Sequence, residues 1–230
     1  MDEKITPLSL IDFVFPKKCV GCHSEGQYLC QGCKAKIVLI QKPFCPICHR
    51  ITPEGQYCPR HRKTFNLTGV IIAAYYESPL KEAIQISKYQ KVYTLYEELA
   101  EILLQRLVQG LPRGRLILCP MPLHRIKKLS RGFNQAEILT KLLASELEIP
   151  ILAGLVRTKN TQAQTLLSKN ERFNNVKDAF QFHGDPIKIK EKTILLIDDV
   201  VTTGATLSAA AAPLQLAGAR NVWGVVLAKH

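Results

Sequence analysis

Two carboxylates and three hydroxyls are concentrated in one short stretch near the C-terminus, Asp198 to Thr206. The carboxylates of Asp198 and Asp199 can accept hydrogen bonds from sugar hydroxyls, and the threonine hydroxyls can donate hydrogen bonds to a phosphate. Gly204 would let backbone N–H groups approach that phosphate closely. This combination of groups predicts a binding site for a ribose phosphate.

A buried strand is expected before this stretch and a helix after it. The apolar run Ile194–Ile197 is typical of a strand in a covered parallel sheet, and we expect a helix from Thr203 to Gln215 that ends near Gly218. The loop between them then lies at a carboxyl strand end and a helix N-terminus, where open α/β sheets bind ligands and anions. The predicted ligand-binding residues are Asp198, Asp199, Val201, Thr202, Thr203, Gly204, Ala205 and Thr206.

The same stretch resembles, position by position, the phosphoribosyl pyrophosphate (PRPP) motif of type I phosphoribosyltransferases. The resemblance implies an α/β fold of that type, with an open, mostly parallel sheet, and PRPP as a ligand, with Mg²⁺ as a further candidate. The main alternative is the Walker-B strand of an ATPase. The chain contains neither G-x-x-x-x-G-K-[ST] nor G-x-G-x-x-G, so the usual phosphate loops of nucleotide triphosphatases and dinucleotide-binding proteins are excluded.

Seven of the eight cysteines lie between Cys19 and Cys58, in three C-x-x-C knuckles and one C-x-x-H knuckle. Each knuckle can present two ligands to one metal, so four knuckles predict two structural zinc ions. The predicted ligands are Cys19, Cys22, Cys30, Cys33, Cys45, Cys48, Cys58 and His61. Sequential pairing gives a four-cysteine site and a three-cysteine, one-histidine site, while cross-bracing of the first knuckle with the third stays open. His23 and His49 are alternative ligands, although solvent-exposed histidines explain both more simply.

Length and composition fit one α/β domain with a small N-terminal appendage. A loop and a change of composition near Lys63–Thr68 mark the boundary, so we expect a zinc ribbon over residues 1–66 and a phosphoribosyltransferase-like domain over 67–230. No apolar run approaches the ~20 residues needed to cross a bilayer. The segment Ile5–Phe15 is typical of a short amphipathic helix rather than a signal peptide. We therefore expect a cytoplasmic protein, which partners could bring to the inner face of the membrane.

Strands and helices should alternate through the C-terminal part. The expected strands besides Ile194–Ile197 are Val70–Tyr75, Leu116–Cys119 and Val222–Ala228. The expected helices besides Thr203–Gln215 begin at Ser78-Pro79, with Ser78 as N-cap, span Leu95–Val108, and open at Arg131–Gln135.

Three more segments, together with the zinc knuckles, resemble the competence protein ComF family. The strand Leu116–Cys119 leads into Pro120-Met121-Pro122-Leu123-His124, and Arg131-Gly132-Phe133-Asn134-Gln135 follows. Further on come Arg157–Gln164, Leu167-Ser168, Arg172–Val176 and Ala179-Phe180. The resemblance spans nearly the whole chain, with its motifs in the same order.

This resemblance implies a phosphoribosyltransferase fold with an N-terminal zinc ribbon, used in the uptake and handling of single-stranded DNA during natural transformation. It places Met121, Pro122, Leu123 and His124 where related enzymes hold pyrophosphate. It also implies a mobile loop over the site at Arg157–Gln164. It does not imply a particular reaction.

The formal net charge of +12 is unusually positive. Seven thiolates and two Zn²⁺ ions together would lower it to about +9. A nucleic-acid partner would use such an excess to displace counterions from its phosphates. The predicted DNA-binding cluster is Arg125, Lys127, Lys128 and Arg131, although each residue alone is explained equally well as solvated charge beside a helix.

Three functions remain open on the sequence alone. The first is a DNA-handling protein that has kept a phosphoribosyltransferase fold. The second is an active phosphoribosyltransferase with an unidentified acceptor. The third is a zinc-ribbon adaptor for a protein partner, for which an ATP-driven DNA translocase of the uptake machinery is the candidate. The fold does not decide between them.

Overall fold

The computed structural model describes residues 17–89, 92–159, 176 and 178–230. The expected helix at 5–15 lies outside these residues, as do the motif segments at 160–164, 167–168 and 172–175. No helix in the described part of the chain is both long and apolar enough to span a membrane.

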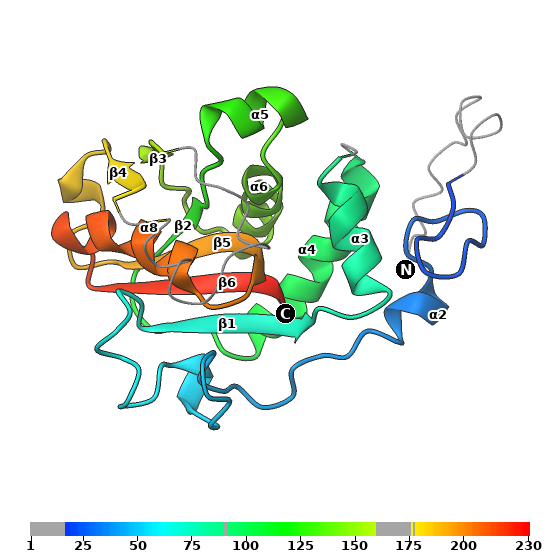
Figure 1. The fold of residues 1–230 in the computed structure, drawn as a ribbon, viewed down its shortest axis with the longest axis horizontal. Coiled ribbons are helices and arrows are strands. Elements are labelled where there is room, and N and C mark those ends of the chain that lie inside the picture. The colour runs from blue at the N-terminus through cyan, green and yellow to red at the C-terminus, as the bar shows by residue number, and fades with distance from the viewer. Residues whose placement is uncertain (1–16, 90–91, 160–175, 177) are drawn as a thin grey trace.

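Four parallel strands form the central sheet in the order β1-β6-β5-β2 (Figure 1). Their bounds are Gly69–Tyr75 for β1, Leu116–Pro120 for β2, Thr193–Val201 for β5 and Asn221–Lys229 for β6. Leu118 pairs with Leu195, which in turn pairs with Trp223. Strands β5 and β6 are buried along most of their length, because helices cover both faces of a parallel sheet.

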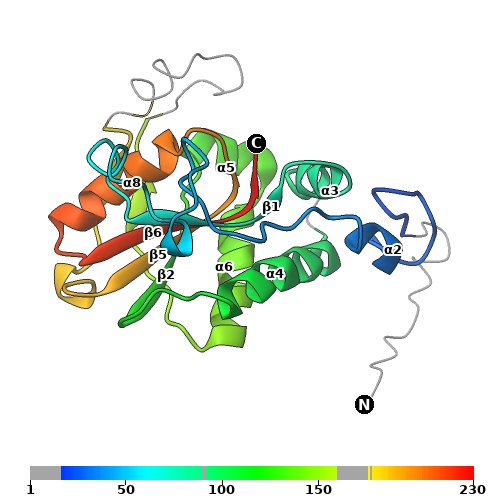
Figure 2. The same cartoon turned by 90° about the horizontal axis from the view of Figure 1, so that it is seen from below.

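Helices α4 (Tyr93–Val108) and α6 (Gln135–Leu147) pack on one face of the sheet, and α8 (Ala205–Leu216) packs on the other (Figure 2). Helix α3 (Leu80–Ser87) packs against α4, and α5 (Arg125–Arg131) connects β2 to α6. A two-stranded antiparallel sheet of β3 (Leu155–Arg157) and β4 (Phe180–Phe182) lies beside α8. The short helices are α2 (Gln31–Lys34), η1 (Pro53–Gly55) and η3 (Pro186–Lys188).

The two halves of the cysteine-rich segment join different faces of the sheet. Cys19, Leu29 and Ile37 belong to the apolar core formed with α3, α4 and α6. By contrast, Phe44, Tyr57, Phe65 and other residues of the second half belong to the core on the α8 side. Between them the chain pairs with edge strand β1, which it covers through the bridges Leu39 to Ala74 and Gln56 to Gly69.

Several element boundaries differ from the prediction. Strand β5 continues to Val201, so Asp198 and Asp199 lie in the strand and not in the loop after it. Helix α8 begins at Ala205 rather than Thr203, because Gly204 takes a left-handed conformation with φ 76°. The first strand starts one residue earlier than expected, at Gly69.

Two of the predicted helix starts are also wrong. Helix α3 begins at Leu80 with Pro79 as N-cap residue, and Ser78 makes no cap. Arg131 does not open a helix but ends α5, which Gly132 terminates with φ 74°. The next helix, α6, is capped by the Asn134 side chain, which accepts a hydrogen bond from the Ala136 N–H.

Candidate functional site

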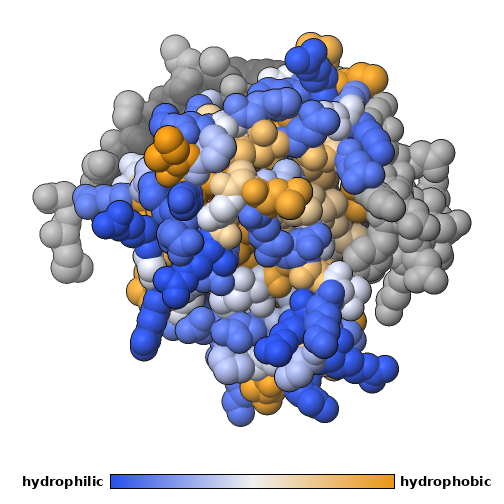
Figure 3. Space-filling model, turned by 90° about the vertical axis from the view of Figure 1, so that its left-hand side faces the viewer, coloured by the Kyte–Doolittle hydropathy of each residue, from blue (hydrophilic) through white to orange (hydrophobic). Residues whose placement is uncertain are grey.

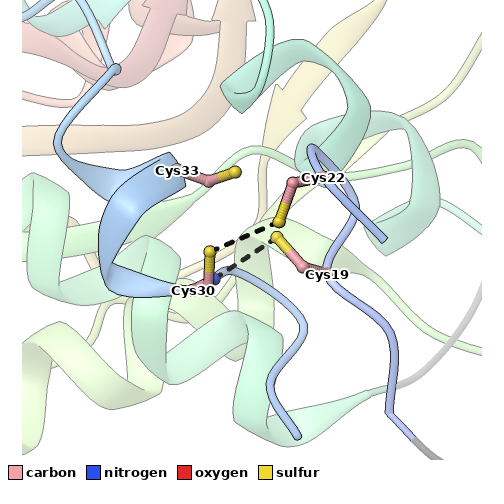
Figure 4. Close-up of side chains that lie close together, drawn as sticks. All are labelled: Cys19, Cys22, Cys30 and Cys33. Carbon is pink, nitrogen blue, oxygen red and sulfur yellow. Dashed lines mark hydrogen bonds between the residues drawn. The ribbon is translucent and has the colours of Figure 1, made fainter. Parts of the chain in front are cut away.

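The eight predicted metal ligands form two separate clusters. Cys19, Cys22, Cys30 and Cys33 form the first (Figure 4), and Cys45, Cys48, Cys58 and His61 form the second. Within each cluster the four donor atoms all lie within 4.8 Å of one another. Sequential pairing of the knuckles is therefore confirmed, and the cross-braced alternative is wrong.

The geometry of both clusters fits zinc. Tetrahedral Zn²⁺ with Zn–S bonds of about 2.3 Å holds its sulfur ligands about 3.8 Å apart. The Sγ atoms of Cys22 and Cys30 are 3.6 Å apart, and those of Cys48 and Cys58 are 3.7 Å apart. Structural zinc in such clusters holds the two ends of each ribbon together.

Backbone amides favour the thiolate form at one cysteine of each cluster, whereas burial raises the pKa of Cys33 in the first cluster to about 12. Burial raises the pKa of Cys19, but N–H groups of Cys30, Cys22 and Gly21 outweigh it and lower that pKa to about 6. The amide-rich turn of the second cluster lowers the pKa of Cys45 to about 6 in the same way, again against burial. Neither His23 nor His49 is part of the clusters, and each takes a positive φ in the turn after its knuckle.

A cavity of about 250 Å³ lies at the carboxyl ends of β2 and β5. Asp198 and Asp199 line it from β5, together with residues from the turn after β2, from α5 and from the starts of α6 and α8. Its lining residues are Lys88, Met121, Pro122, Leu123, Lys127, Arg131, Asn134, Gln135, Ala136, Arg157, Asp198, Asp199, Val200 and Thr206. Four cations thus surround two carboxylates, which makes the cavity suited to an anion that also carries hydroxyls.

The two carboxylates have different surroundings. Lys88 Nζ lies 2.9 Å from Asp199 Oδ2, whereas Asp198 Oδ1 accepts a hydrogen bond of 2.9 Å from the Asp199 backbone N–H. Burial, together with the neighbouring charge of Asp199, raises the pKa of Asp198 to about 7. Burial and the charges of Arg157 and Arg131 lower the pKa of Lys127. The cavity therefore holds both an acid that ionises near neutral pH and a cluster of mutually repelling cations.

The cavity is lined by part of the predicted ligand-binding stretch. Only Asp198, Asp199 and Thr206 of the predicted ligand-binding residues line the cavity. Val201 is buried in the core, and the Thr202 carbonyl accepts a hydrogen bond from the Lys229 ammonium. The remaining members, Thr203, Gly204 and Ala205, form the turn into α8, where the Thr203 hydroxyl accepts from the Ala205 N–H.

The predicted pyrophosphate loop is divided between two places. Met121, Pro122 and Leu123 line the cavity. His124 instead caps α5, with Nδ1 accepting a hydrogen bond from the Ile126 N–H, and lines an adjacent groove. Asn134 Nδ2 donates to the Met121 carbonyl at 3.0 Å and so fastens this loop to the start of α6.

The predicted DNA-binding cluster also divides, because α5 presents its charges on two sides. Lys127 and Arg131, one helical turn apart, line the cavity. Arg125 and Lys128 line the adjacent groove, where Lys128 pairs with Glu137 at 2.8 Å. The four residues are therefore not one patch, although both pairs remain available to a long polyanion.

Comparison with known proteins agrees with both halves of the chain. A double zinc ribbon domain model matches residues 10–61, and a phosphoribosyl transferase domain model matches residues 132–230. Competence protein F of Haemophilus influenzae is 31% identical over 230 residues, which cover 93% of this chain and 98% of that protein. This chain belongs to the ComF family.

Other relatives are similar over most of their length. Competence protein ComFC of Bacillus subtilis (strain 168) is 27% identical to this chain. The aligned region covers 80% of this chain and 76% of ComFC. DNA utilization protein YhgH of Escherichia coli (strain K12) is 29% identical over 84% of this chain and 87% of its own. The family assignment confirms the double zinc ribbon and the phosphoribosyltransferase-like α/β fold, while the domain boundary at 66/67 stays a prediction.

In this ComF-family chain the second zinc ribbon packs against the turn at Gly204, between β5 and α8. The ring of Tyr57, next to the ligand Cys58, stacks on Phe65 with ring centroids 4.3 Å apart. Its buried hydroxyl, which has no hydrogen-bond partner among the described residues, lies 2.7 Å from where a Cβ on Gly204 would be. A side chain at position 204 is therefore excluded both by the positive φ and by Tyr57.

Two contributors to the site could not be found from the sequence. Lys88 follows α3 and reaches Asp199 from an element that no motif marks. Tyr57 belongs to the cysteine-rich segment, far along the chain from Gly204. A resemblance did cover Asn134, but no spacing argument predicted that its amide would hold Met121.

Proposed function

We propose that this protein handles single-stranded DNA during the uptake and use of incoming DNA in natural transformation. Its relatives are a Competence protein F and DNA utilization proteins, aligned over most of the chain. The high positive charge suits a partner whose phosphates must be neutralised. An ATP-driven DNA translocase of the uptake machinery is the protein partner that such a role requires.

The observation that carries the ligand assignment is the cavity, with four cations and two carboxylates at the carboxyl end of the sheet. We infer that it binds PRPP or a phosphate of similar shape. Asp198 and Asp199 would accept hydrogen bonds from ribose hydroxyls, and Thr206 with the α8 N-terminus would hold the 5′-phosphate. Lys127, Arg131 and Arg157 would face the pyrophosphate, and Mg²⁺ would suit the same carboxylate and phosphate oxygens.

An active phosphoribosyltransferase is the second candidate. It is favoured by one observation, that the Asp198–Asp199 pair and the Met121–Leu123 loop line the same cavity. In a transfer reaction the carboxylates would stabilise positive charge as it develops at the reacting ribose carbon, while the cations would hold the departing pyrophosphate. No feature of the described residues identifies an acceptor.

One pair of measurements on the same sample separates the two functions. Fluorescence anisotropy with an oligothymidine at several salt concentrations should show binding that weakens steeply with salt. Pyrophosphate release from PRPP should be measured in parallel with a panel of bases. DNA binding without release supports the DNA-handling function, whereas base-dependent release without DNA binding would assign the protein to the transferases.

A further inference from the structure

A second cation-rich site lies at the opposite end of the sheet from the phosphate cavity. A turn precedes each of the adjacent strands β2, β5 and β6, and each of these three turns contains arginine or lysine. Together they line a hollow of about 540 Å³. Its cations are Arg113, Arg115, Lys190, Lys192 and Arg220, and the one acidic residue lining it is Glu191.

These cations lie at the surface of the hollow. All except the half-buried Lys192 are exposed, and within 17–89, 92–159, 176 and 178–230 none of the five forms an ion pair. Five like charges around one hollow repel one another, and a polyanion would relieve that repulsion by giving up its counterions. The site therefore favours several linked negative charges over a single one.

The backbone already holds the three turns together. The Thr193 N–H donates to the Arg115 carbonyl at 2.9 Å, and the Arg220 N–H donates to the Lys192 carbonyl at 2.9 Å. The Glu191 N–H likewise donates to the Gly218 carbonyl at 3.0 Å. Because the main chain is fixed, binding would require ordering only of the side chains, which lowers its entropic cost.

An apolar strip adjoins these cations. A neighbouring hollow of about 440 Å³ shares Lys192 with the first. The apolar residues Pro150, Ile151, Leu152 and Ala153 line one part of it, and Asp185 and Lys188 also line it. The Ile151 side chain is 44% exposed there. Figure 3 views the molecule from the end at which the strands begin and shows hydrophilic side chains around an apolar area. Apolar surface beside cations can cover the faces of unpaired bases, which are already buried in a duplex.

The hollows continue along the β2 edge to the phosphate cavity. A third hollow of about 500 Å³ shares His183 with the apolar strip, and it shares Pro122, Leu123 and Arg157 with the cavity. It also contains Arg125 and Lys128 of α5. The five residues of β2 correspond to about 17 Å, which several nucleotides are needed to span.

We propose that a single strand of DNA lies along this edge, with its phosphates on the amino-end cations and bases against the strip containing Ile151. Its path leads past α5 to the phosphate cavity. This inference deepens the proposed function and rests on it, because it assigns the surface by which the strand is bound.

The test compares two double variants with the same change in charge. Arg115→Ala/Arg220→Ala removes two cations of the path, and Lys81→Ala/Lys141→Ala removes two exposed cations of α3 and α6 that line none of the hollows described above. Anisotropy with an oligothymidine across a salt series should show weaker binding for the first variant only. Its slope of log K against log salt should fall by about 1.4, since each phosphate neutralised on a single strand contributes about 0.7. Both variants should melt at the wild-type temperature.

A third variant tests the apolar strip. Ile151→Ser should weaken binding of the oligothymidine severalfold while leaving the salt slope unchanged, because it removes base contact and no charge. Binding of a duplex of equal length should not change in this variant.

The outcomes are distinct. Equal affinity and slope for the wild type and Arg115→Ala/Arg220→Ala would overturn the proposed path while leaving DNA handling intact. An equal loss of duplex binding in Ile151→Ser would overturn the assignment to a single strand. Absence of DNA binding by the wild-type protein would overturn the path and the proposed function together.

Discussion

At the scale of single residues, the two carboxylates of the cavity differ in how well their charges are compensated within the protein. Asp198 is partly buried beside Asp199, and desolvation together with the charge of Asp199 raises its pKa to about 7. Lys88 pairs with Asp199 and compensates that residue directly. Without a bound ligand, the carboxylate of Asp198 is therefore less well compensated than that of Asp199. A ligand with hydroxyls, or a cation, would compensate it.

This arrangement predicts a pH-dependent gain in stability for Asp198→Asn. The pKa of Asp198 is higher in the folded protein than the value of about 3.9 for an unfolded chain, so the folded state binds more protons between these values. The protonated Asp198 side chain should therefore contribute to the stability of the wild type below about pH 4. This contribution should be lost as the pH rises to about 7. At pH 8 the variant should be more stable by at most about 4 kcal/mol, as measured by urea unfolding without ligand.

The control for this prediction is Glu97→Gln, which neutralises an exposed carboxylate on α4. The free energy of unfolding of this variant should differ little from that of the wild type, both below about pH 4 and at pH 8. PRPP affinity, measured by calorimetry, should fall in Asp198→Asn despite the gain in stability. A variant that is less stable than the wild type at pH 8 would contradict the proposed environment of Asp198.

At the scale of elements, the zinc ribbons and the sheet are joined more closely than the sequence indicates. Spacing was sufficient to predict the eight members of the two clusters, because a C-x-x-C turn positions both of its sulfurs locally. The strand before Asp198 and the helix after Gly204 were predicted for the same reason, as local pattern. Local pattern could not reveal that Tyr57 packs behind Gly204, because that contact joins segments far apart in the chain.

The split of α5 could have been anticipated only in part. Helical spacing places Lys127 and Arg131 on one side, but which side faces the cavity depends on how α5 sits between β2 and α6. The same limit applies to Lys88, whose pairing with Asp199 depends on the tertiary packing of α3. The sequence therefore located the motifs, and the structure was needed to decide which of their side chains line the cavity.

The position of the second ribbon predicts unequal effects of losing the two metals. Cys45→Ser should reduce bound zinc from two ions to one and weaken PRPP binding, because Tyr57 lies next to the ligand Cys58 and supports Gly204. The matched variant Cys19→Ser should also lose one zinc but lose less PRPP affinity, since its cluster packs with α3 and α4, whereas Gly204 is contacted by Tyr57 and Phe65 of the second ribbon. Each ion contributes roughly 10 kcal/mol or more to ribbon folding.

Elemental analysis and calorimetry with PRPP provide the measurements for this pair. Limited proteolysis would show whether cleavage is confined to the altered ribbon. Equal PRPP affinity in Cys45→Ser and Cys19→Ser would show that the contact between Tyr57 and Gly204 has no functional consequence. If wild-type protein is purified without chelators and contains no zinc, both predicted metal sites are wrong.

At the scale of the whole molecule, positive charge follows the β2 edge from one end of the sheet to the other. The cations at the strand starts, those on α5 and those in the cavity belong to hollows that share residues in sequence. Steering by such a field raises the rate at which a nucleic acid associates and makes that rate sensitive to salt. The cavity that contains Asp198 and Asp199 then lies at one end of a longer series of hollows.

The division of α5 yields the prediction that best separates the two ligands. Arg125→Ala/Lys128→Ala should weaken binding of single-stranded DNA and leave PRPP affinity unchanged, because these two residues line the outer groove. Lys127→Ala/Arg131→Ala removes the same charge from the same helix. It should lower the affinity for both DNA and PRPP, because these residues line the cavity. Either pair should lower the DNA salt slope by about 1.4, and the quadruple variant should lower it by about twice as much.

Anisotropy across a salt series and calorimetry with PRPP measure the two affinities on each variant. If the end of the strand occupies the cavity, PRPP should compete with DNA in the wild type, and this competition should persist in Arg125→Ala/Lys128→Ala. If the strand stops at the outer groove, both ligands should bind together. DNA binding that is unchanged in the quadruple variant, or that prefers one duplex sequence, would contradict DNA handling by this surface and make the active phosphoribosyltransferase the better account of the cavity.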